Sequence, residues 1–219
     1  LSRADLLLRK GEIEALVASG CETVWIGAES GSQAVLDRMQ KGTTISQILD
    51  ASRSLREAGI RVGFFIQFGY PGEAWRDIAA TFRLVRMAMP NELGISVAYP
   101  LPGTGFMEQV KTQLVANTPN WRDSDDLAML YRGPFPTRFY RLLHRQLHDY
   151  LALLRTVQAP RTSTRMFIRS AIKAGYLAAT LTLRSVALVA VQFAKHRQPV
   201  EIRPELHRAQ ASTPSVQET

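Results

Sequence analysis

Cysteine is almost absent from this sequence: Cys21 is the single thiol among 219 residues. One cysteine cannot form a disulfide within the chain, and it cannot build a multi-cysteine metal site. The sequence therefore predicts no metal ligands in this chain, and a reducing, cytoplasmic setting is the simplest expectation.

Acidic residues are scarce in the C-terminal part. Residues 133–219 hold 13 Lys and Arg against 4 Asp and Glu, whereas residues 1–132 hold 14 against 15. The basic excess therefore indicates what the C-terminal segment touches, and it says little about a substrate of the front part. Dense interleaving of basic and aromatic residues is also missing, so we expect no nucleic-acid partner.

An uninterrupted apolar run is lacking at both ends of the chain. Charged side chains interrupt residues 1–20, which excludes a signal-peptide pattern there. The first residue is Leu1, so we interpret the chain as a fragment or a processed protein.

Between Ala174 and Ala194 the only charge is Arg184, and this central charge favours an interfacial helix over a spanning one. The last twenty or so residues have the composition of a disordered tail.

Helical and strand periods alternate along the first hundred residues. The predicted helices are 4–19, 32–40, 43–58 and 73–89, and the predicted strands are 21–28, 60–68 and 93–99. Gly11 allows a break in the first helix. This alternation predicts an α/β fold with a parallel sheet. Three strands make a small sheet, so we expect half of a larger structure, followed by helices at 138–157 and 164–196.

Three predicted strands end in polar, glycine-containing or proline-containing turns, at residues 27–32, 68–73 and 99–104. Ligands of parallel α/β folds bind beyond the carboxyl ends of the strands. Glu29 could accept hydrogen bonds from the two hydroxyls of a ribose, and Gly27 and Gly31 permit close backbone approach. The alternative is that Glu29 and Ser30 only cap the following helix.

The second and third strand ends offer a surface for a flat ligand. Gln67 shares one strand face with Gly63 and Phe65, and a buried amide needs a partner. The turn at Gly69, and the aromatic and stiff pair Tyr99 and Pro100, could lie against that ligand; the alternative is that both segments are only tight loops. Two other features favour structural roles: Cys21 as a small core residue, and the His144 and His148 pair as solvated or capping side chains.

Together, the segments Gly27-Ala28-Glu29-Ser30-Gly31-Ser32, Phe68-Gly69-Tyr70-Pro71-Gly72-Glu73 and Tyr99-Pro100-Leu101-Pro102-Gly103-Thr104 resemble the second half of a radical S-adenosylmethionine (SAM) enzyme. The resemblance covers roughly residues 1–155 and is strongest to the class with a cobalamin-binding domain. Residues 121–131 (WRDSDDLAMLY) resemble the anaerobic magnesium-protoporphyrin monomethyl ester oxidative cyclase.

This resemblance implies a parallel half-barrel, strands four to six of a partial (β/α)6 barrel, followed by an α-helical extension. It assigns Glu29 and Ser30 to the SAM ribose, with Gly27 and Gly31 beside them. It places Gln67, Gly69, Tyr99 and Pro100 around the adenosyl group. The family's CxxxCxxC motif for a [4Fe-4S] cluster is absent from this sequence, as is the cobalamin domain, so the cluster ligands would lie outside this chain and the chain alone would be inactive.

The function implied is generation of a 5′-deoxyadenosyl radical for oxidative cyclisation of a porphyrin side chain, in tetrapyrrole biosynthesis. The alternatives are a cobalamin-dependent radical SAM methyltransferase, or a non-catalytic scaffold whose basic tail contacts a membrane. The expected partners are a small substrate such as a porphyrin, an electron donor such as ferredoxin or flavodoxin, and a membrane surface touched peripherally by the tail. The expected divisions are 1–115 for the half-barrel, 116–160 for a helical extension, 161–198 for the basic and apolar helical segment, and 199–219 for the tail.

Overall fold

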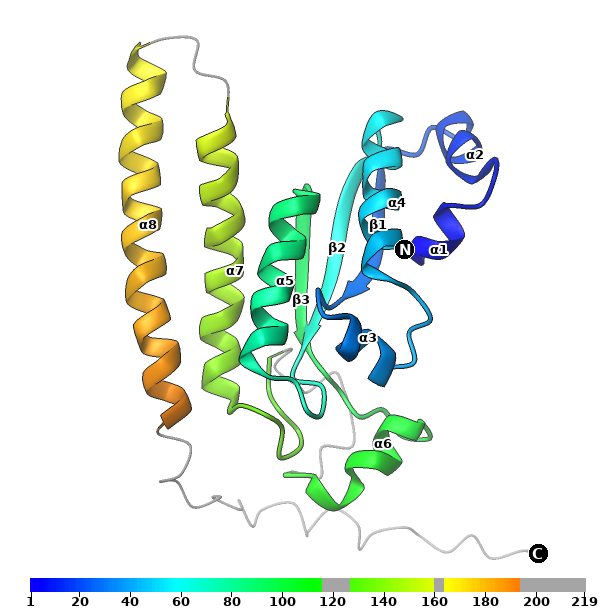
Figure 1. Ribbon diagram of the computed structural model, residues 1–219, viewed down its shortest axis with the longest axis vertical. Coiled ribbons are helices and arrows are strands. Elements are labelled where there is room, and N and C mark those ends of the chain that lie inside the picture. The colour runs from blue at the N-terminus through cyan, green and yellow to red at the C-terminus, as the bar shows by residue number, and fades with distance from the viewer. Residues whose placement is uncertain (116–126, 160–163, 194–219) are drawn as a thin grey trace, which may run out of the picture.

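The computed structural model describes residues 1–115, 127–159 and 164–193 (Figure 1). Strands and helices alternate through the first of these ranges, and two long helices fill the others. The elements are α1 (Ala4–Leu7), α2 (Glu12–Ala18), β1 (Thr23–Glu29), α3 (Gln33–Arg38), α4 (Ile45–Glu57), β2 (Arg61–Phe68), α5 (Trp75–Ala88), β3 (Glu92–Val97), α6 (Gly105–Val110), the 3-10 turn η1 (Lys111–Gln113), α7 (Thr137–Gln158) and α8 (Thr164–Phe193).

The three strands form one parallel sheet in the order β1-β2-β3. Trp25 of β1 lies opposite Gly63 of β2, and Phe65 of β2 lies opposite Gly94 of β3. The outer edge of β1 also carries a parallel bridge between Ser2 and Ile26. The predicted α/β fold with a parallel sheet is therefore confirmed.

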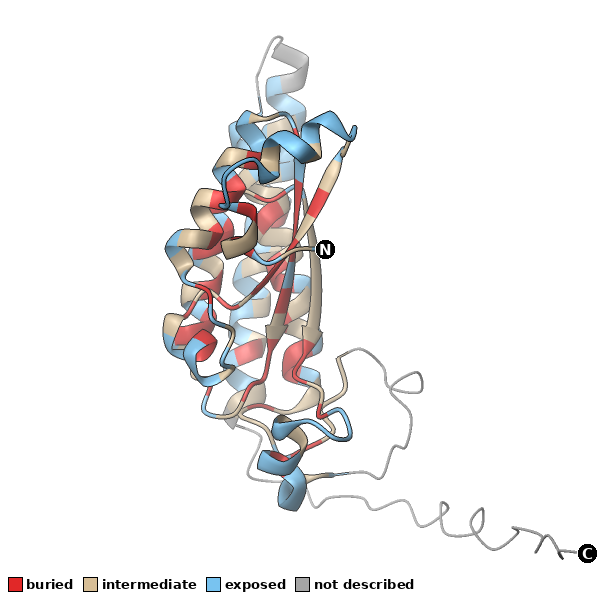
Figure 2. Cartoon of the chain, turned by 90° about the vertical axis from the view of Figure 1, so that its right-hand side faces the viewer, coloured by how far each residue is buried: buried red, intermediate tan, exposed pale blue. Residues whose placement is uncertain are grey.

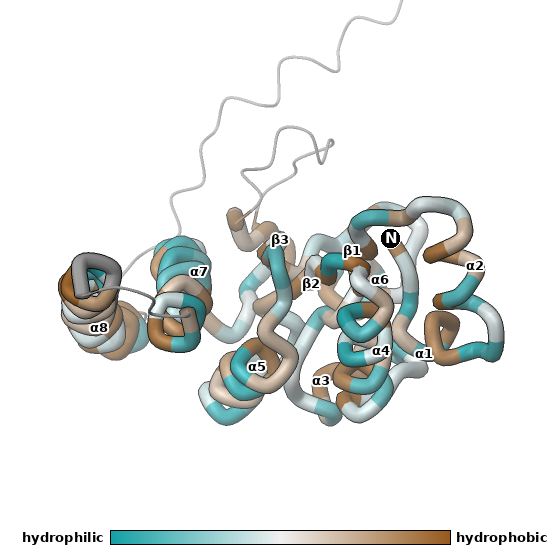
Figure 3. Tube along the Cα trace, turned by 90° about the horizontal axis from the view of Figure 1, so that it is seen from above, coloured by the Kyte–Doolittle hydropathy of each residue, from teal (hydrophilic) through white to brown (hydrophobic). Residues whose placement is uncertain are grey.

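One face of the sheet is covered by helices. Ile26, Phe64 and Ile66 point to this face and are at most 1% exposed. Figure 3 shows α3, α4 and α5 on this side of the strands, and Figure 2 shows the buried residues concentrated between the layers. Because strands flanked by helices need apolar side chains on the covered face, this layer is the hydrophobic core.

The opposite face of the sheet has no helix over it among the described residues (Figure 3). Trp25 and Phe65 lie on this face with their ring centroids 4.6 Å apart, and Phe65 is 41% exposed. Gly63 and Gly94 make room for the two rings, since a Cβ on Gly63 would lie 2.5 Å from the indole and one on Gly94 would lie 2.8 Å from the Phe65 ring. We call this surface the open face.

Local sequence signals explain some of the helix boundaries. Thr44 caps α4 through a reciprocal capping box with Gln47. Residues 4–19 divide into α1 and α2, as the glycine at position 11 allows. Ser32 occupies the expected cap position of α3, but its side chain makes no capping bond and instead donates to Asp77 Oδ1 at 2.6 Å.

The C-terminal helical extension is present as predicted. Helix α7 packs against α5 and β3, and α8 packs along α7 as the outermost element of Figure 1. Phe139, Leu143 and Leu147 of α7 join the main core. The predicted tail at 199–219 lies outside the described residues, and so do residues 116–126, which hold much of the segment compared with the cyclase. The predicted domain boundaries therefore stay predictions.

Candidate functional site at the carboxyl ends of the strands

Glu29 ends β1 in an unusual backbone conformation. Its φ of 58° lies in the left-handed region, and the pairing with β2 shifts register between Gly27 and Glu29. A non-glycine residue in this region is uncommon and often marks a functional constraint. The strand thereby bends at the position where it presents a carboxylate.

The Glu29 carboxylate forms an ion pair with Lys41, whose Nζ donates to Oε1 at 2.6 Å. Lys41 comes from the loop between α3 and α4. The two side chains are 20% and 25% exposed, so solvent still reaches the pair. Among the described residues Oε2 of Glu29 has no donor, so one carboxylate oxygen can still accept hydrogen bonds.

A cavity of about 360 Å³ surrounds this ion pair. Glycine at position 27 leaves room for the ion pair at the cavity wall, because a Cβ there would lie 3.0 Å from Lys41 Nζ and 3.1 Å from Glu29 Oε1. Residues of the chain start, β1, β2 and the α3–α4 loop line the cavity with charged, apolar and backbone groups. The lining residues are Leu1, Ser2, Arg3, Leu6, Gly27, Glu29, Lys41 and Phe65. Its size falls in the range of roughly 300–1,000 Å³ that small-ligand sites occupy.

Ser30 and Gly31 point away from this cavity, toward α5. Ser30 is fully buried, and its hydroxyl lies 3.4 Å from that of Thr81 and accepts from Ser32 N at 3.1 Å. Gly31 N donates to Thr81 Oγ1 at 2.9 Å, and a Cβ on Gly31 would lie 2.3 Å from Ala80 O. The close backbone approach at Gly31 is therefore to α5. Neither Glu29 nor Ser30 caps α3, so the helix-cap alternative is wrong.

Gln67 lies on the open face, half-buried, beside Ser96 of β3. It shares this face with Phe65 as the strand alternation predicts. Just beyond it Gly69, with φ of 85°, turns the chain and donates its N–H to Glu73 Oε2 at 2.7 Å. A side chain at position 69 would crowd Met129 and Tyr140, which lie 3.0 and 3.2 Å from the site of a Cβ.

Glu73 is a buried carboxyl group behind this turn, with 4% of its surface exposed. Burial raises the pKa of Glu73 to about 8, the nearby Asp77 adds to the rise, and the bond from Gly69 N opposes it. Glu73 Oε1 and the hydroxyl of Tyr140 are buried without a partner among the described residues. Glu73 precedes α5 and does not belong to its first turn, contrary to the predicted helix start at residue 73.

Two tyrosines complete this buried polar cluster. Tyr131 donates its hydroxyl to the carbonyl of Gly69. Burial, followed by the proximity of Glu73, raises the pKa of both Tyr131 and Tyr140 above the usual value for tyrosine. A protonated Glu73 and neutral tyrosines are the states that burial favours here.

Asp77 differs from Glu73 because it is well provided with donors. Burial opposes its ionisation, but the hydrogen bonds from Ser32 Oγ at 2.6 Å and Ala74 N at 2.9 Å outweigh burial, and the pKa of Asp77 lies below its usual value. The carboxylate therefore joins the loop after β1 to the start of α5, which keeps the first two strand ends together.

The end of β3 closes the edge from the other side. Tyr99 is half-buried and Pro100 is buried. Thr104 caps α6 by accepting from Met107 N at 3.2 Å. Beneath this segment a second apolar cluster, made of Val35, Tyr70, Ala98, Val110 and Tyr131, packs under the strand ends.

The structure thus brings Gly27 and Glu29 into one cavity and places Gln67 on the adjoining open face. Gly69, Tyr99 and Pro100 follow the ends of β2 and β3 at the same edge of the sheet, while Ser30 and Gly31 support the edge from behind. No ligand contact tests the predicted cofactor roles of these residues, which stay predictions.

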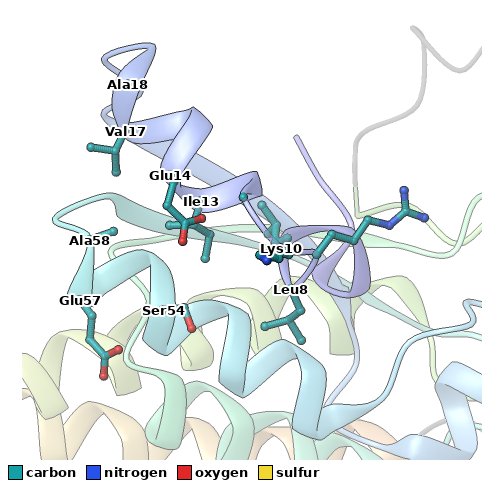
Figure 4. A pocket seen from close by; sticks show the side chains of 12 residues that line it. Leu8, Lys10, Ile13, Glu14, Val17, Ala18, Ser54, Glu57 and Ala58 are labelled. Carbon is teal, nitrogen blue, oxygen red and sulfur yellow. The ribbon is translucent and has the colours of Figure 1, made fainter.

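A larger cavity of about 650 Å³ lies at the other end of the sheet, between α1, α2 and α4 (Figure 4). Its lining includes the apolar Leu8, Ile13 and Val17 and the charged Lys10 and Glu57. Because α2 and α4 both lead into the amino ends of strands, this cavity is remote from the polar strand ends.

The described residues contain no cluster of three or more metal-ligating side chains. Cys21 precedes the amino end of β1, half-buried against the core, with its thiol 3.6 Å from Thr23 O. The His144 and His148 rings neighbour each other on α7, with centroids 4.5 Å apart.

The sequence does not predict several of the residues that lie at this edge of the sheet. Lys41 carries no motif, and its approach to Glu29 depends on how the α3–α4 loop folds back. Thr81 and Asp77 belong to a helix whose contact with the first strand end is set by tertiary packing. The hydroxyl of Thr81 and the apolar positions around it do lie on the inward stripe of α5, which is the one signal the sequence offers.

Part of the chain is similar in sequence to known proteins. Residues 2–85, which run from the start of the chain into α5, match the model of the Radical SAM superfamily. An uncharacterised methyltransferase of Pyrococcus horikoshii is 32% identical over 110 residues, which cover 50% of this chain and 24% of that protein. A bacteriochlorophyllide d C-12(1)-methyltransferase of Chlorobaculum tepidum is 32% identical over 49% of this chain and 24% of that protein.

A putative methylthiotransferase of Methanocaldococcus jannaschii is 32% identical over 40% of this chain and 19% of its own length. The solved structure of Methanocaldococcus infernus Elp3 aligns with a TM-score of 0.47 at 16% identity, over 73% of this chain and 32% of that one. The matched region therefore spans about a quarter or less of each of these curated relatives.

Proposed function

We propose that this chain forms part of the SAM-binding side of a radical SAM enzyme that transfers a methyl or methylthio group. The proposal rests mainly on the Glu29 carboxylate. Glu29 has a positive φ at the end of β1, and its side chain lines a cavity together with Gly27 and Phe65. The superfamily match over residues 2–85 and the named methyltransferase relatives support the proposal.

The residues present fit the adenosine half of SAM. In the part of the chain that the structure describes, no group donates to Oε2 of Glu29, which can accept from the ribose hydroxyls, while Lys41 Nζ donates to Oε1 and orients the carboxylate. Gly27 leaves the room that a Cβ would fill. Gln67 offers an amide on the open face, and Gly69 and Pro100, both buried, follow the ends of β2 and β3 at the same edge of the sheet.

A [4Fe-4S] cluster, reduced by an electron donor, would supply the one electron that cleaves bound SAM to methionine and a 5′-deoxyadenosyl radical. The cluster ligands would come from outside this chain, because Cys21 is its only cysteine and lies near the amino end of β1. The task of the described residues is to orient the adenosyl group and to exclude water from the open face.

Cyclisation of a porphyrin side chain is the second candidate. The relative that acts on bacteriochlorophyllide d favours a tetrapyrrole substrate, whichever reaction this protein performs. The cyclase resemblance itself rests on residues 121–131, of which 121–126 lie outside the described residues. Cobalamin as a methyl carrier and ferredoxin or flavodoxin as electron donor remain parts of the proposal.

Exchange of Glu29 for Gln in the intact protein that contains this chain tests the ribose role. The amide keeps the shape but weakens acceptance and breaks the ion pair with Lys41, so we expect SAM affinity to fall at least about tenfold, the equivalent of about 1.4 kcal/mol. Equilibrium dialysis with labelled SAM under anaerobic conditions gives the affinity. Glu22→Gln, exposed before the other end of β1, is the matched control. Equal affinity of Glu29→Gln and the control would remove the ribose role.

A further inference from the structure

Three polar side chains of α8, those of Arg184, Ser185 and Gln192, bond to the rest of the protein. Arg184 bonds to Asp149 of α7, and the amide of Gln146 donates to Ser185 Oγ at 3.0 Å and to Leu181 O at 3.1 Å. Near the end of α8, Gln192 accepts from the indole N–H of Trp75. The helix is therefore docked along its length by polar bonds, in addition to the buried Leu177 and Leu188.

The opposite side of α8 is apolar and exposed. We call it the outer stripe; it consists of Ile168, Ile172, Tyr176, Leu183 and Val186, which are 52%, 69%, 69%, 71% and 65% exposed. Their spacing of three, four and seven positions puts them on one side of a helix. The helix thus reverses the usual arrangement of a soluble protein, in which the exposed face is the polar one.

The charges on α8 have one sign. Residues 164–193 contain no acidic residue. Arg169 and Lys173 are exposed near the outer stripe at the first half of the helix. Two copies of this surface would bring like charges together, whereas anionic lipid headgroups would attract it. Charge complementarity therefore favours an acidic lipid surface over a second copy of this chain.

The packing of α7 decides how such a helix meets a bilayer. By length and composition, Phe167–Gln192 is the one candidate span in the described part of the chain, with a mean hydropathy of 1.6. Insertion across the bilayer would also draw in its neighbour α7 with Arg145, His148 and Asp149, which is energetically costly. Lying flat, α8 can bury its outer stripe among the lipid tails while α7 stays in water.

We propose that α8 binds the surface of an anionic lipid bilayer in the plane of the interface, through the outer stripe and with help from Arg169 and Lys173. This surface is separate from the strand-end site, so it holds whether or not the proposed SAM role does. A protein with a porphyrin-like, poorly soluble substrate would gain from working at such a surface.

Co-sedimentation of the whole chain with phosphatidylcholine vesicles, with and without about 30% phosphatidylserine, tests the proposal. We expect binding to the anionic vesicles that weakens with added salt, because the ionic part is screened. The variant Ile172→Asp/Leu183→Asp/Val186→Asp should bind at least about tenfold less, since charged groups enter the hydrocarbon boundary unfavourably. Arg169→Gln/Lys173→Gln should bind neutral vesicles like the wild type and lose the preference for phosphatidylserine.

The matched control is Val17→Asp/Met87→Asp/Val157→Asp, which makes the same change of charge at exposed apolar positions outside α8. Circular dichroism establishes that each variant is folded. Wild-type binding that the control retains and the outer-stripe variant loses supports the proposal. The proposal would be overturned if the wild type did not bind vesicles, or if both triple variants lost binding equally. It would also be overturned if size-exclusion chromatography showed a wild-type dimer that the outer-stripe substitutions dissociate, with no binding to vesicles.

Discussion

Glu73 shows how a single residue can couple the candidate site to pH. The carboxyl group accepts from Gly69 N in the turn that follows β2, and burial raises its pKa to about 8. Between the ordinary carboxyl pKa of about 4.3 and this raised value, the folded protein holds a proton that the unfolded chain has released. The contribution of Glu73 to stability is therefore complete at low pH and is lost as the pH rises toward 8.

Exchange of Glu73 for Gln should abolish this loss. Between pH 5 and pH 7 we expect the free energy of unfolding of the wild type to fall, relative to that of Glu73→Gln, by up to about 1.4 kcal/mol per pH unit. Urea unfolding across this range measures the difference. Burial lowers the pKa of His144 and of His148, so below about pH 6.5 these histidines make the free energy of unfolding rise with pH. Because the wild type and Glu73→Gln both contain them, their effect cancels when the two proteins are compared.

Glu57→Gln is the control for this measurement, because it changes an exposed carboxyl group on α4. It should follow the wild type at every pH. Parallel pH curves for the wild type and Glu73→Gln would show that Glu73 is already ionised in the folded protein.

At the scale of helices and strands, local chemistry in the sequence predicted much of what is seen. Neighbouring residues predict the helix ends at Gly20 and Gly59 and the cap at Thr44. They also predict the alternation that puts Phe65 and Gln67 on one face of β2. Contacts made at long range were not predictable in the same way. Ser32 turns from α3 to Asp77, 45 positions along the chain, and Lys41 turns back to Glu29, because folded neighbours offer better partners than the local backbone does.

Two leucines of α8 test the docked orientation of this helix. Leu188 is 3% exposed and faces the core, whereas Leu183 is 71% exposed on the outer stripe. Leu188→Ala should lower the free energy of unfolding by about 2–4 kcal/mol, since it leaves a cavity against the core. Leu183→Ala should change it by less than about 0.5 kcal/mol. Thermal or urea unfolding of both variants compares the same chemical change on the two sides of one helix, and equal losses would mean that α8 is not docked this way.

At the scale of the whole molecule, the two faces of the sheet differ: one is packed into the hydrophobic core, and the other adjoins the candidate site. Helices α3, α4 and α5 cover one face of the sheet (Figure 3), and the other face carries Trp25, Phe65 and Gln67. Composition and periodicity predict the covered face, because continuous apolar strands need it. Strand alternation separates Phe65 from Phe64 and Phe68, but it does not show which of the two faces of the sheet is left open.

Phe64 and Phe65 are adjacent residues that point to opposite faces of β2, and they give the sharpest test of this separation. Phe64 is completely buried among the helices, so Phe64→Ala should destabilise the protein by about 3–5 kcal/mol. Phe65→Ala removes a ring that is 41% exposed and loses mainly its contact with Trp25, worth about 0.5–1.5 kcal/mol. If the open face holds the adenosyl group or the substrate, Phe65→Ala in the intact protein should instead weaken SAM binding or raise the KM for substrate, with the protein still folded. Unfolding curves and binding assays on the two variants should therefore show opposite ranks, and a Phe65→Ala protein that binds SAM and substrate like the wild type would place the ligand elsewhere than on this face.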